Sequence, residues 1–425
     1  MGSTPSTQTA SSLGQRLGAI LGAEHVRPAM AEDAISGRPA SWVVEPGSEQ
    51  EVAGLLRFAD ESQLAVIPRG GGTKMGWGNA VERADIVLSL RRLNRVIEHA
   101  WADLTVTVEA GCSFAELQRT LARHGQRLAL DPLWPEQATL GGILSSNDTG
   151  ALRLYYGGLR DLVIGITLAL ADGTLAKSGG KVVKNVAGYD LPKLVTGAHG
   201  TLGIVTRAVF RVHPHPANTR TLTLHGGDPA QVQTVLLALL NSNLTPASVQ
   251  VRVDEQMAPV LDIGLEGTEA GLSSQELRIR NIAQPLSVNV EPASHWGARQ
   301  ELWADPAPAA IAKVSVISSS IAGTLARISR LAAAQNAGWR AVFQATGLGW
   351  VRIEADGDRS SALLGDLRSQ VRAEGGALVI LQQPAHPKQL DAWGEAGDAL
   401  ALMHAVKQQF DPNRTLNPGR YVGGI

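Results

Sequence analysis

Three glycine clusters hold the residue types in this sequence that are best suited to binding a ligand. The first, "AVIPRGGGTKMGWG" (65–78), places three glycines directly after an apolar strand pattern, between Arg69 and Thr73. Glycine lets backbone N–H groups approach a ligand closely and adopt positive φ, which forms a concave site for phosphate. A flexible turn is the simpler explanation of one such cluster. Neither G-x-G-x-x-G nor the P-loop pattern occurs in it.

Two further clusters repeat this chemistry along the chain. "PEQATLGGILSSNDTG" (135–150) combines Gly141 and Gly142 with hydroxyl and amide side chains, which can hydrogen-bond a polar cofactor. "GAHGTLGIV" (197–205) places its glycines where a strand begins. Three unrelated tight turns of this composition in one domain are less expected than one binding groove. The sequence therefore predicts a single groove to which all three clusters contribute.

Charge and cysteine content exclude several other functions. Lysine plus arginine (38) nearly balance aspartate plus glutamate (39), so nothing indicates nucleic acid or an anionic membrane surface as the main partner. The single cysteine excludes a disulfide framework and an iron–sulfur cluster held by this chain alone. No apolar run reaches the ~18 residues of a membrane span. The N-terminus lacks a signal-peptide pattern, so we expect a cytoplasmic protein that binds a small molecule.

Strand and helix patterns alternate up to about residue 215 and position the glycine clusters. Ser48 and Glu51 have capping-box spacing, and the apolar residues of 52–59 follow at helical period. The strand "LAVIP" (64–68) then leads into the first glycine cluster. "LTVTVEAG" (104–111) alternates at period two, as a half-buried strand does.

The pattern changes after "HPHPAN" (213–218). Segments such as "TRTLTLHG", "AQVQTVLLALLNSN" and "ASVQVRVD" alternate strand and helix without glycine clusters, and a strand–helix–strand–helix order follows. This order predicts a second domain in which helices cover an antiparallel sheet. The last segment, "ALALMHAVKQQFDPNRTLNPGRYVGGI", predicts one helix and a proline- and glycine-bearing tail that packs on the first domain.

The motifs also resemble a known family. "IPRGGGT", "ATLGGILSSNDTG", "GLRDLVIGITLALADG", "NVAGYDLPKLVTGAHGTLGIVT" and "FDPNRTLNPG" resemble the FAD-binding domain of the vanillyl-alcohol oxidase and p-cresol methylhydroxylase (PCMH) type. "GGKVVKNVAGYDLPKL" is similar to the FAD-binding subunits of bacterial glycolate oxidase complexes. The resemblance covers residues 42–214 and the C-terminal tail, whereas the middle domain matches in layout only.

The resemblance implies an α+β fold: a PCMH-type FAD-binding domain of two α/β subdomains, and a cap domain. We expect a partly disordered lead-in (1–37), the FAD-binding domain (38–216), the cap domain (217–377) and a C-terminal segment that returns to the FAD-binding domain (378–425).

The resemblance also implies which residues hold the cofactor FAD. The loop 68–74 would surround the pyrophosphate, residues 133–139 and 146–149 would lie beside the ribityl chain and isoalloxazine, and 199–205 would line the adenosine and flavin side. The predicted cofactor-binding residues are Pro68, Arg69, Gly70, Gly71, Gly72, Thr73, Lys74, Pro135, Thr139, Leu140, Gly141, Gly142, Ser146, Asn147, Thr149, Gly150, Gly200, Thr201, Gly203, Ile204 and Val205.

Two departures from the family refine this expectation. Members with covalent flavin carry histidine where this chain has Thr73, so we expect non-covalent FAD. Relatives that oxidise 2-hydroxy acids carry a histidine- and acid-rich metal and substrate motif in the middle domain, and we find no such motif in this sequence. We therefore expect no metal site, and no catalytic residue can be assigned.

Several single residues have two explanations each. Cys112 precedes a helix start that could lower its pKa, but a small buried residue is the simpler account. His213 and His215 form a turn or a ligand pair. The tyrosines 155 and 156 either shield flavin or pack, and the lysines 181 and 184 balance cofactor phosphate or are solvated. Arg160 and Asp161 are expected to cap local structure.

The function implied by the resemblance is that of the FAD-binding subunit of a glycolate oxidase complex, which oxidises glycolate, a 2-hydroxy acid, to glyoxylate. Its partners would be a larger FAD-linked subunit and an iron–sulfur subunit. The chain would be cytoplasmic, or these partner subunits would hold it at the inner membrane. The alternatives are a stand-alone FAD-dependent enzyme for another hydroxy compound and a non-catalytic scaffold.

Overall fold

The chain forms two compact units. The computed structural model describes residues 7–181, 188–254, 258–284, 286–291, 296–384 and 389–425. Unit 1 comprises Met1–Asp148, Gly158–Pro214 and Glu395–Ile425, and unit 2 comprises Thr149–Gly157 and His215–Gly394. These limits differ from the predicted domain ranges in that 149–157 and 378–394 belong to unit 2.

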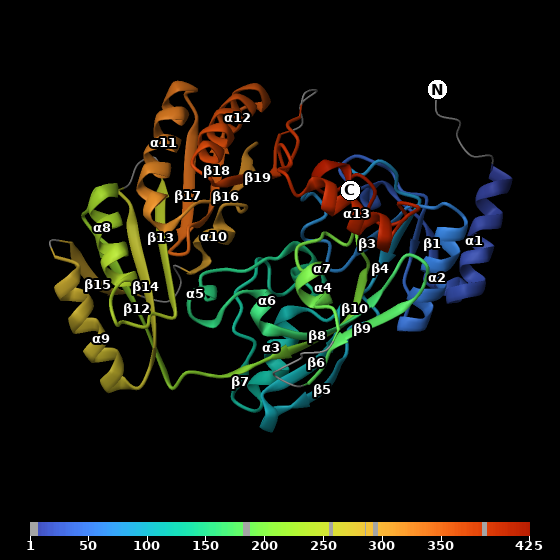
Figure 1. The fold of residues 1–425 in the computed structure, drawn as a ribbon, viewed down its shortest axis with the longest axis horizontal. Coiled ribbons are helices and arrows are strands. Elements are labelled where there is room, and N and C mark those ends of the chain that lie inside the picture. The colour runs from blue at the N-terminus through green and yellow to red at the C-terminus, as the bar shows by residue number, and fades with distance from the viewer. Residues whose placement is uncertain (1–6, 182–187, 255–257, 285, 292–295, 385–388) are drawn as a thin grey trace. The chain divides into compact units, whose positions relative to one another are not determined.

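Unit 1 contains two main sheets (Figure 1). The first has the order β1-β2-β4-β3, in which β2, β4 and β3 are parallel and β1 is antiparallel. The second has the order β5-β6-β10-β8-β9 and is antiparallel. The strands of unit 1 are β1 (Val26–Pro28), β2 (Trp42–Val44), β3 (Val66–Arg69), β4 (Ile86–Ser89), β5 (Val96–Ala100), β6 (Thr105–Glu109), β7 (Gln126–Arg127), β8 (Val163–Ala169), β9 (Leu175–Gly179), β10 (Ile204–Arg211) and β11 (His213–Pro214).

The helices of unit 1 begin where the sequence supplies a cap. Ser48 accepts a hydrogen bond from the backbone N–H of Glu51 at 3.1 Å, which starts α2, as its capping-box spacing predicts. Thr139 caps α4 in the same way through Gly142. The helices are α1 (Thr7–Leu21), α2 (Glu49–Glu61), α3 (Phe114–Ala122), α4 (Leu140–Ser146), α6 (Leu159–Leu162), α7 (Leu191–Val195) and α13 (Leu400–Phe410).

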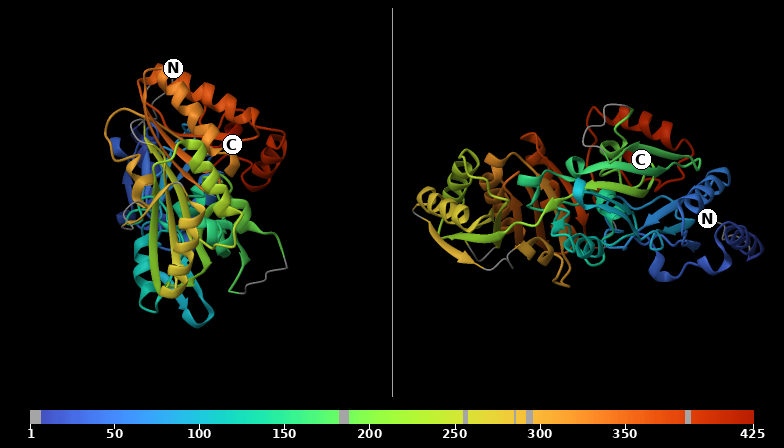
Figure 2. Two further views of the ribbon diagram at one scale, coloured as in Figure 1. Left: turned by 90° about the vertical axis from the view of Figure 1, so that its left-hand side faces the viewer. Right: turned by 90° about the horizontal axis from the view of Figure 1, so that it is seen from below.

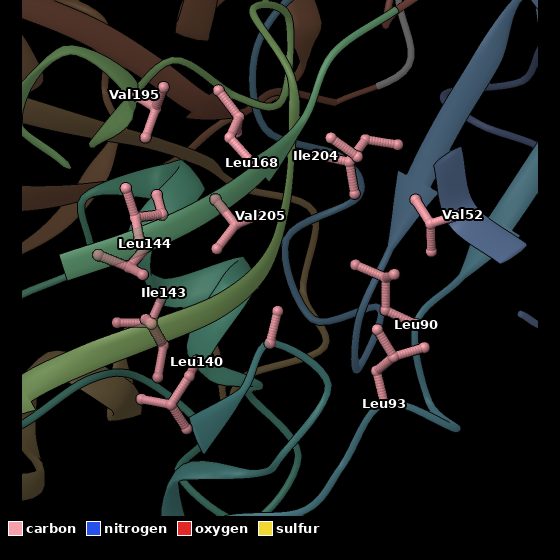
Figure 3. Packing of buried hydrophobic residues seen from close by; sticks show 14 of the residues in the cluster. Val52, Leu90, Leu93, Leu140, Ile143, Leu144, Leu168, Val195, Ile204 and Val205 are labelled. Atoms are coloured by element: carbon pink, nitrogen blue, oxygen red, sulfur yellow. The ribbon is translucent and has the colours of Figure 1, made fainter. Parts of the chain in front are cut away.

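One hydrophobic core joins these elements and positions the glycine clusters. Figure 3 shows Ile143 and Leu144 of α4 beside Val205 of β10, and α4 contacts β10 directly. The range 1–37, expected as a partly disordered lead-in, contains α1 and β1, and Leu17 is fully buried in this core. The Ser/Thr-rich start of the sequence had obscured the apolar period of α1.

Unit 2 is an eight-stranded antiparallel sheet in the order β15-β12-β14-β13-β17-β18-β16-β19. Its strands are β12 (Asn218–His225), β13 (Ser248–Asp254), β14 (Val260–Gly267), β15 (Ser287–Glu291), β16 (Ala310–Ser315), β17 (Gly338–Gln344), β18 (Leu348–Glu354) and β19 (Ala377–Gln382). Its helices are α5 (Arg153–Tyr156), α8 (Pro229–Leu240), α9 (Glu269–Ile282), α10 (Ala298–Glu301), α11 (Ile321–Ala334) and α12 (Gly357–Ala373).

Alternate residues of this sheet form a second core with α8, α9, α11 and α12, which lie alongside it in Figure 1 and, from two other sides, in Figure 2. The predicted α+β class and the helix-covered antiparallel sheet are confirmed. Among the described residues, every helix is too short or too polar to cross a bilayer.

Candidate functional site

The first glycine cluster follows β3 and packs against the second. A Cβ on Gly71 would lie 1.8 Å from the carbonyl oxygen of Gln137, and one on Gly70 would lie 2.0 Å from Oγ1 of Thr139. Both positions therefore need glycine because two loops meet there. Gly72 differs: its φ is 82°, and a Cβ would meet nothing within 4 Å, so its backbone borders open space.

The three glycine clusters line one pocket of unit 1, as the sequence predicted. The pocket has an empty volume of about 750 Å³, part of it open to solvent, which is within the range of small-molecule sites. The predicted cofactor-binding residues that line it are Pro68, Arg69, Gly70, Gly71, Gly72, Thr73, Lys74, Thr139, Gly141, Gly142, Ser146, Gly200, Gly203, Ile204 and Val205.

Six predicted residues are not among those that line this pocket: Pro135, Leu140, Asn147, Thr149, Gly150 and Thr201. Leu140, the first residue of α4, is fully buried in the core, and Asn147 ends α4 in the left-handed conformation. The hydroxyl of Thr201 donates to the carbonyl oxygen of Ala198 at 2.7 Å. Thr149 and Gly150 belong to unit 2. These residues support the glycine clusters or lie outside unit 1.

The C-terminal segment adds residues that the sequence did not single out. It runs beside β3, where Val66 donates to the carbonyl oxygen of Thr415 at 2.7 Å and accepts from the backbone N–H of Asn417 at 3.1 Å. It supplies Asn417 and Arg420 to the pocket lining. The other lining residues outside the list of predicted residues are Met75, Leu90, Ser145 and His199, of which His199 lies in the expected range 199–205. The tail motif "FDPNRTLNPG" was the available signal, although no residue of it was assigned to the site.

Asn417 has a side chain suited to a ligand. It is 4% exposed, and its Nδ2 donates to the carbonyl oxygen of His199 at 2.7 Å. His199 itself has a φ of 51°. Among the described residues, no group hydrogen-bonds Oδ1 of Asn417. A buried acceptor of this kind is stabilised by a ligand donor.

Arg69, Lys74 and Arg420 line the pocket. Arg69 contacts Asp33 at 2.8 Å, and Arg27 contacts the same carboxylate at 2.6 Å. The hydrogen bond from Arg27, with a further one from Arg69, holds the pKa of Asp33 far below its usual range, so this group of three side chains is net positive. Arg420 donates to the carbonyl oxygens of Lys74 and Met75, and burial lowers its pKa to about 10, which leaves it charged at neutral pH.

Lys74 connects two of the glycine clusters. Its Nζ lies 3.1 Å from the carboxylate of Asp148, and the two side chains are 8% and 1% exposed. The ring centroids of Trp134 and Trp77 lie 5.4 and 5.6 Å from the same Nζ. Asp148 also accepts from the backbone N–H of Leu133 at 2.9 Å. The ammonium group thus holds the first loop against the second.

The structure also decides between explanations for residues outside the pocket. Cys112 is fully buried, and burial raises the pKa of its thiol to about 11, so it is a small core residue. Lys181 pairs with Glu98 on the surface. Lys184 lies outside the described residues. Asp161 accepts from the backbone N–H of Gly158 at 2.8 Å, and this capping role was expected.

The tyrosines and histidines have structural contacts. The hydroxyl of Tyr156 hydrogen-bonds Glu266, and the Tyr155 ring packs at 4.9 Å from that of Tyr156. His213 lies in β11, paired with Arg127 of β7. Within the described ranges, no three His, Cys, Asp or Glu side chains are grouped so that they could hold a metal ion.

Comparison with known protein families matches two parts of the chain. Residues 40–179 match the FAD binding domain, and residues 391–421 match the C-terminal domain of FAD linked oxidases. The first match contains two of the glycine clusters, and the second contains Asn417 and Arg420.

Three curated proteins illustrate the relatives. The glycolate oxidase subunit GlcD of Bacillus subtilis is 34% identical over 49% of this chain and 44% of its own length. The mitochondrial D-lactate dehydrogenase [cytochrome] of Arabidopsis thaliana is 26% identical over 89% of this chain and 73% of its own length. A D-2-hydroxyglutarate dehydrogenase of Xanthomonas citri is 31% identical over 52% of this chain and 47% of its own length. The chain spans about half the length of most curated relatives that it matches.

Solved structures share the fold of the whole chain. A substrate-bound p-cresol methylhydroxylase has a TM-score of 0.81 at 18% identity and covers 97% of each chain. A 4-ethylphenol oxidase from Gulosibacter chungangensis has a TM-score of 0.77 at 17% identity over 98% of this chain and 97% of its own. The fold is therefore of the p-cresol methylhydroxylase type, and the cofactor of this chain is FAD.

The described pocket fits FAD. The open backbone at Gly72 can approach a pyrophosphate, and the net positive groups at Arg69 and Arg420 suit its charge. Oδ1 of Asn417 can accept from a hydroxyl or amino group of the cofactor.

Proposed function

We propose that this chain is a flavoprotein oxidoreductase that holds FAD non-covalently and takes part in the oxidation of glycolate or a related 2-hydroxy acid. The observation that carries this proposal is the pocket shared by the glycine clusters and the C-terminal segment. Relatives named for glycolate, D-lactate and D-2-hydroxyglutarate support the substrate class. In this reaction a 2-hydroxy acid loses a hydride from its α-carbon and a proton from its hydroxyl group, which leaves a 2-oxo acid.

FAD, when bound, supplies the hydride acceptor. The chain's own residues would bind and orient it: the open backbone at Gly72 would approach the pyrophosphate, and the cations at Arg69 and Arg420 would balance its charge. Asn417 would accept a hydrogen bond from a polar group of the cofactor through its Oδ1. Lys74 fixes the relative positions of the two loops through Asp148, so the pocket keeps its shape.

We further propose that the chain works as a subunit with a larger flavin subunit and an iron–sulfur subunit. The single cysteine of this chain is too few to ligate an iron–sulfur cluster, so this proposal assigns that centre to a partner. A stand-alone dehydrogenase is the second candidate, because the Arabidopsis D-lactate dehydrogenase aligns with 89% of this chain.

The test is to purify the chain alone and with its partner subunits, release the cofactor with acid, and add glycolate or D-lactate without oxygen. Acid-releasable FAD that is bleached only in the complex supports the subunit proposal. Bleaching in the lone chain supports the stand-alone enzyme. FAD that stays attached after acid treatment would contradict non-covalent binding, and the absence of bleaching in both preparations would contradict the oxidation of these acids.

A further inference from the structure

The eight-stranded sheet of unit 2 has a buried polar face. Val249 and Val251 of β13 point into the core with the helices, so Gln250 and Arg252 point to the opposite face. Gln250 is nevertheless only 3% exposed. Polar side chains buried on a sheet face require hydrogen-bond partners.

Four buried polar residues form a row across this face. The strands β12, β14, β13 and β17 are neighbours in this order (Figure 1). Directly paired residues across them are Thr223, Asp262, Gln250 and Gln344. Asp262 accepts from Thr223 and Gln250 at 3.0 Å each, and from Arg252 at 2.5 and 3.0 Å. The acid in the row therefore has a full set of partners.

Gln344, at the end of the row, has a less complete set of hydrogen bonds than Asp262. Its Nε2 donates to the carbonyl oxygen of Thr149 at 3.5 Å, but among the described residues no donor reaches its Oε1. Trp350 of β18 lies on the same face, opposite Val342, and is therefore the diagonal neighbour of Gln344. Trp350 is 1% exposed, and its Nε1 also has no acceptor within the described ranges. Among the described residues, the acceptor Oε1 of Gln344 on β17 and the donor Nε1 of Trp350 on the adjacent strand β18 thus have no hydrogen-bond partner.

Two cations lie around the same indole. The guanidinium carbon of Arg299 is 4.7 Å from the ring centroid of Trp350, and Nη1 of Arg299 donates to the carbonyl oxygen of Thr149 at 2.9 Å. Lys313 of β16 is paired directly with Trp350, and its Nζ is 5.9 Å from the ring. Lys313 is half-buried, whereas Trp350 is almost fully buried.

We propose that Gln344, Trp350, Lys313 and Arg299 form a binding site for a small carboxylate that bears a hydroxyl group on the adjacent carbon. The carboxylate accepts from Nε1 of Trp350 beside the two cations, and the hydroxyl donates to Oε1 of Gln344. A simple anion would leave the acceptor of Gln344 without a donor, and a neutral alcohol would not use the positive charge. This inference rests on the proposed function, which names 2-hydroxy acids as substrates.

The test measures binding of 2-hydroxy-2-methylpropanoate to the FAD-loaded protein by calorimetry. This acid has no hydrogen on its α-carbon, so it can bind but cannot lose a hydride. Gln344→Met and Trp350→Phe should each lower its affinity by about tenfold, the loss expected for one buried hydrogen bond to a charged or polar ligand. The hydroxyl-free 2-methylpropanoate should bind the wild type more weakly, with no further loss in Gln344→Met.

Two control variants distinguish a lost ligand contact from a disturbed fold. Gln233→Met removes an amide in α8 whose Nε2 and Oε1 both have partners, Ser318 and Ala322. Trp339→Phe changes an indole in the hydrophobic core of the same unit. Both controls should bind the analogue like the wild type, and melting temperatures should be compared for all four variants.

The outcomes separate this site from the proposed function. Failure of the wild type to bind the analogue, or wild-type affinity in both Gln344→Met and Trp350→Phe, overturns the site. If hydroxy acids reduce the flavin but these variants bind normally, the proposed function stands without this site. If analogue binding depends on both residues but no hydroxy acid reduces the flavin, the site stands and the proposed function fails.

Discussion

Asn417 joins the C-terminal segment to the pocket through a single amide. We predict that Asn417→Leu raises the Kd for FAD by about tenfold, because it removes one acceptor for the cofactor and one donor to His199. Fluorescence titration of the apoprotein with FAD measures this change. Asn413→Leu is the matched control, since Asn413 lies in the same segment and contacts the surface residue Asp60. Equal losses in both variants would mean that the segment, rather than the amide, is responsible.

The ion pair of Lys74 and Asp148 is buried, and its two members cannot be removed independently. Lys74→Met should destabilise unit 1 by about 3–5 kcal/mol, because it removes the cation in contact with a buried carboxylate. Lys74→Met combined with Asp148→Asn should recover much of this loss, since asparagine still accepts from Leu133 without a charge. Urea unfolding of the apoproteins measures both. A double variant no more stable than the single one would show that the charge of Asp148 is not the cause.

At the residue scale, the sequence predicted which chemistry lines the pocket but not which atoms face it. The run 70–74 was located by composition, because consecutive glycines after a strand have few other uses. Leu140 and Asn147 have the same motif context, yet one packs in the core and the other ends a helix. Asn417 could not be assigned, since its place depends on a strand-like pairing with Val66, some 350 residues earlier in the chain.

The meeting of two glycine loops can be tested at the scale of the element. Gly71→Ala should weaken FAD binding by tenfold or more, because the added Cβ would lie 1.8 Å from the carbonyl oxygen of Gln137 and displace the loop. Gly76→Ala in the same loop should bind FAD normally, since nothing lies within 4 Å of its Cβ. The same titration measures both variants. Normal binding by Gly71→Ala would mean that the loop can shift without loss of the site.

The group formed by Asp33, Arg27 and Arg69 links β1 to the end of β3 and should make stability depend on pH. The pKa of Asp33 is lowered in the folded state, so its carboxylate stabilises the fold above the unfolded value of about 4 and loses this effect as the pH falls toward the folded value. Asp33→Asn should therefore be less stable than the wild type at pH 7, with a difference that shrinks toward pH 2. Denaturant unfolding across this range measures it, and a constant difference would contradict the assignment.

The sequence predicted individual helices and strands better than it predicted which segments belong to which unit. A capping-box spacing and an apolar period located α2, because a helix start and a buried face are local properties. The grouping of 149–157 with unit 2 depends on contacts such as those of Thr149 with Arg299 and Gln344, which no local pattern encodes. The row of buried polar residues on the unit 2 sheet is equally invisible in the sequence, because it needs the register of four strands.

At the scale of the whole molecule, the main hydrophobic cores of the two units are separate clusters among the described residues, and they predict separable unfolding events. All residues that line the FAD pocket belong to unit 1, whereas the proposed carboxylate site belongs to unit 2. FAD at a hundredfold excess over its Kd should stabilise the first unit by about 2.7 kcal/mol, and 2-hydroxy-2-methylpropanoate should stabilise the second. Calorimetry of the apoprotein with each ligand alone would then show one transition moving at a time. If either ligand moved both transitions equally, the two units would unfold as one cooperative body, and the assignment of each site to its own unit would need a test by variants.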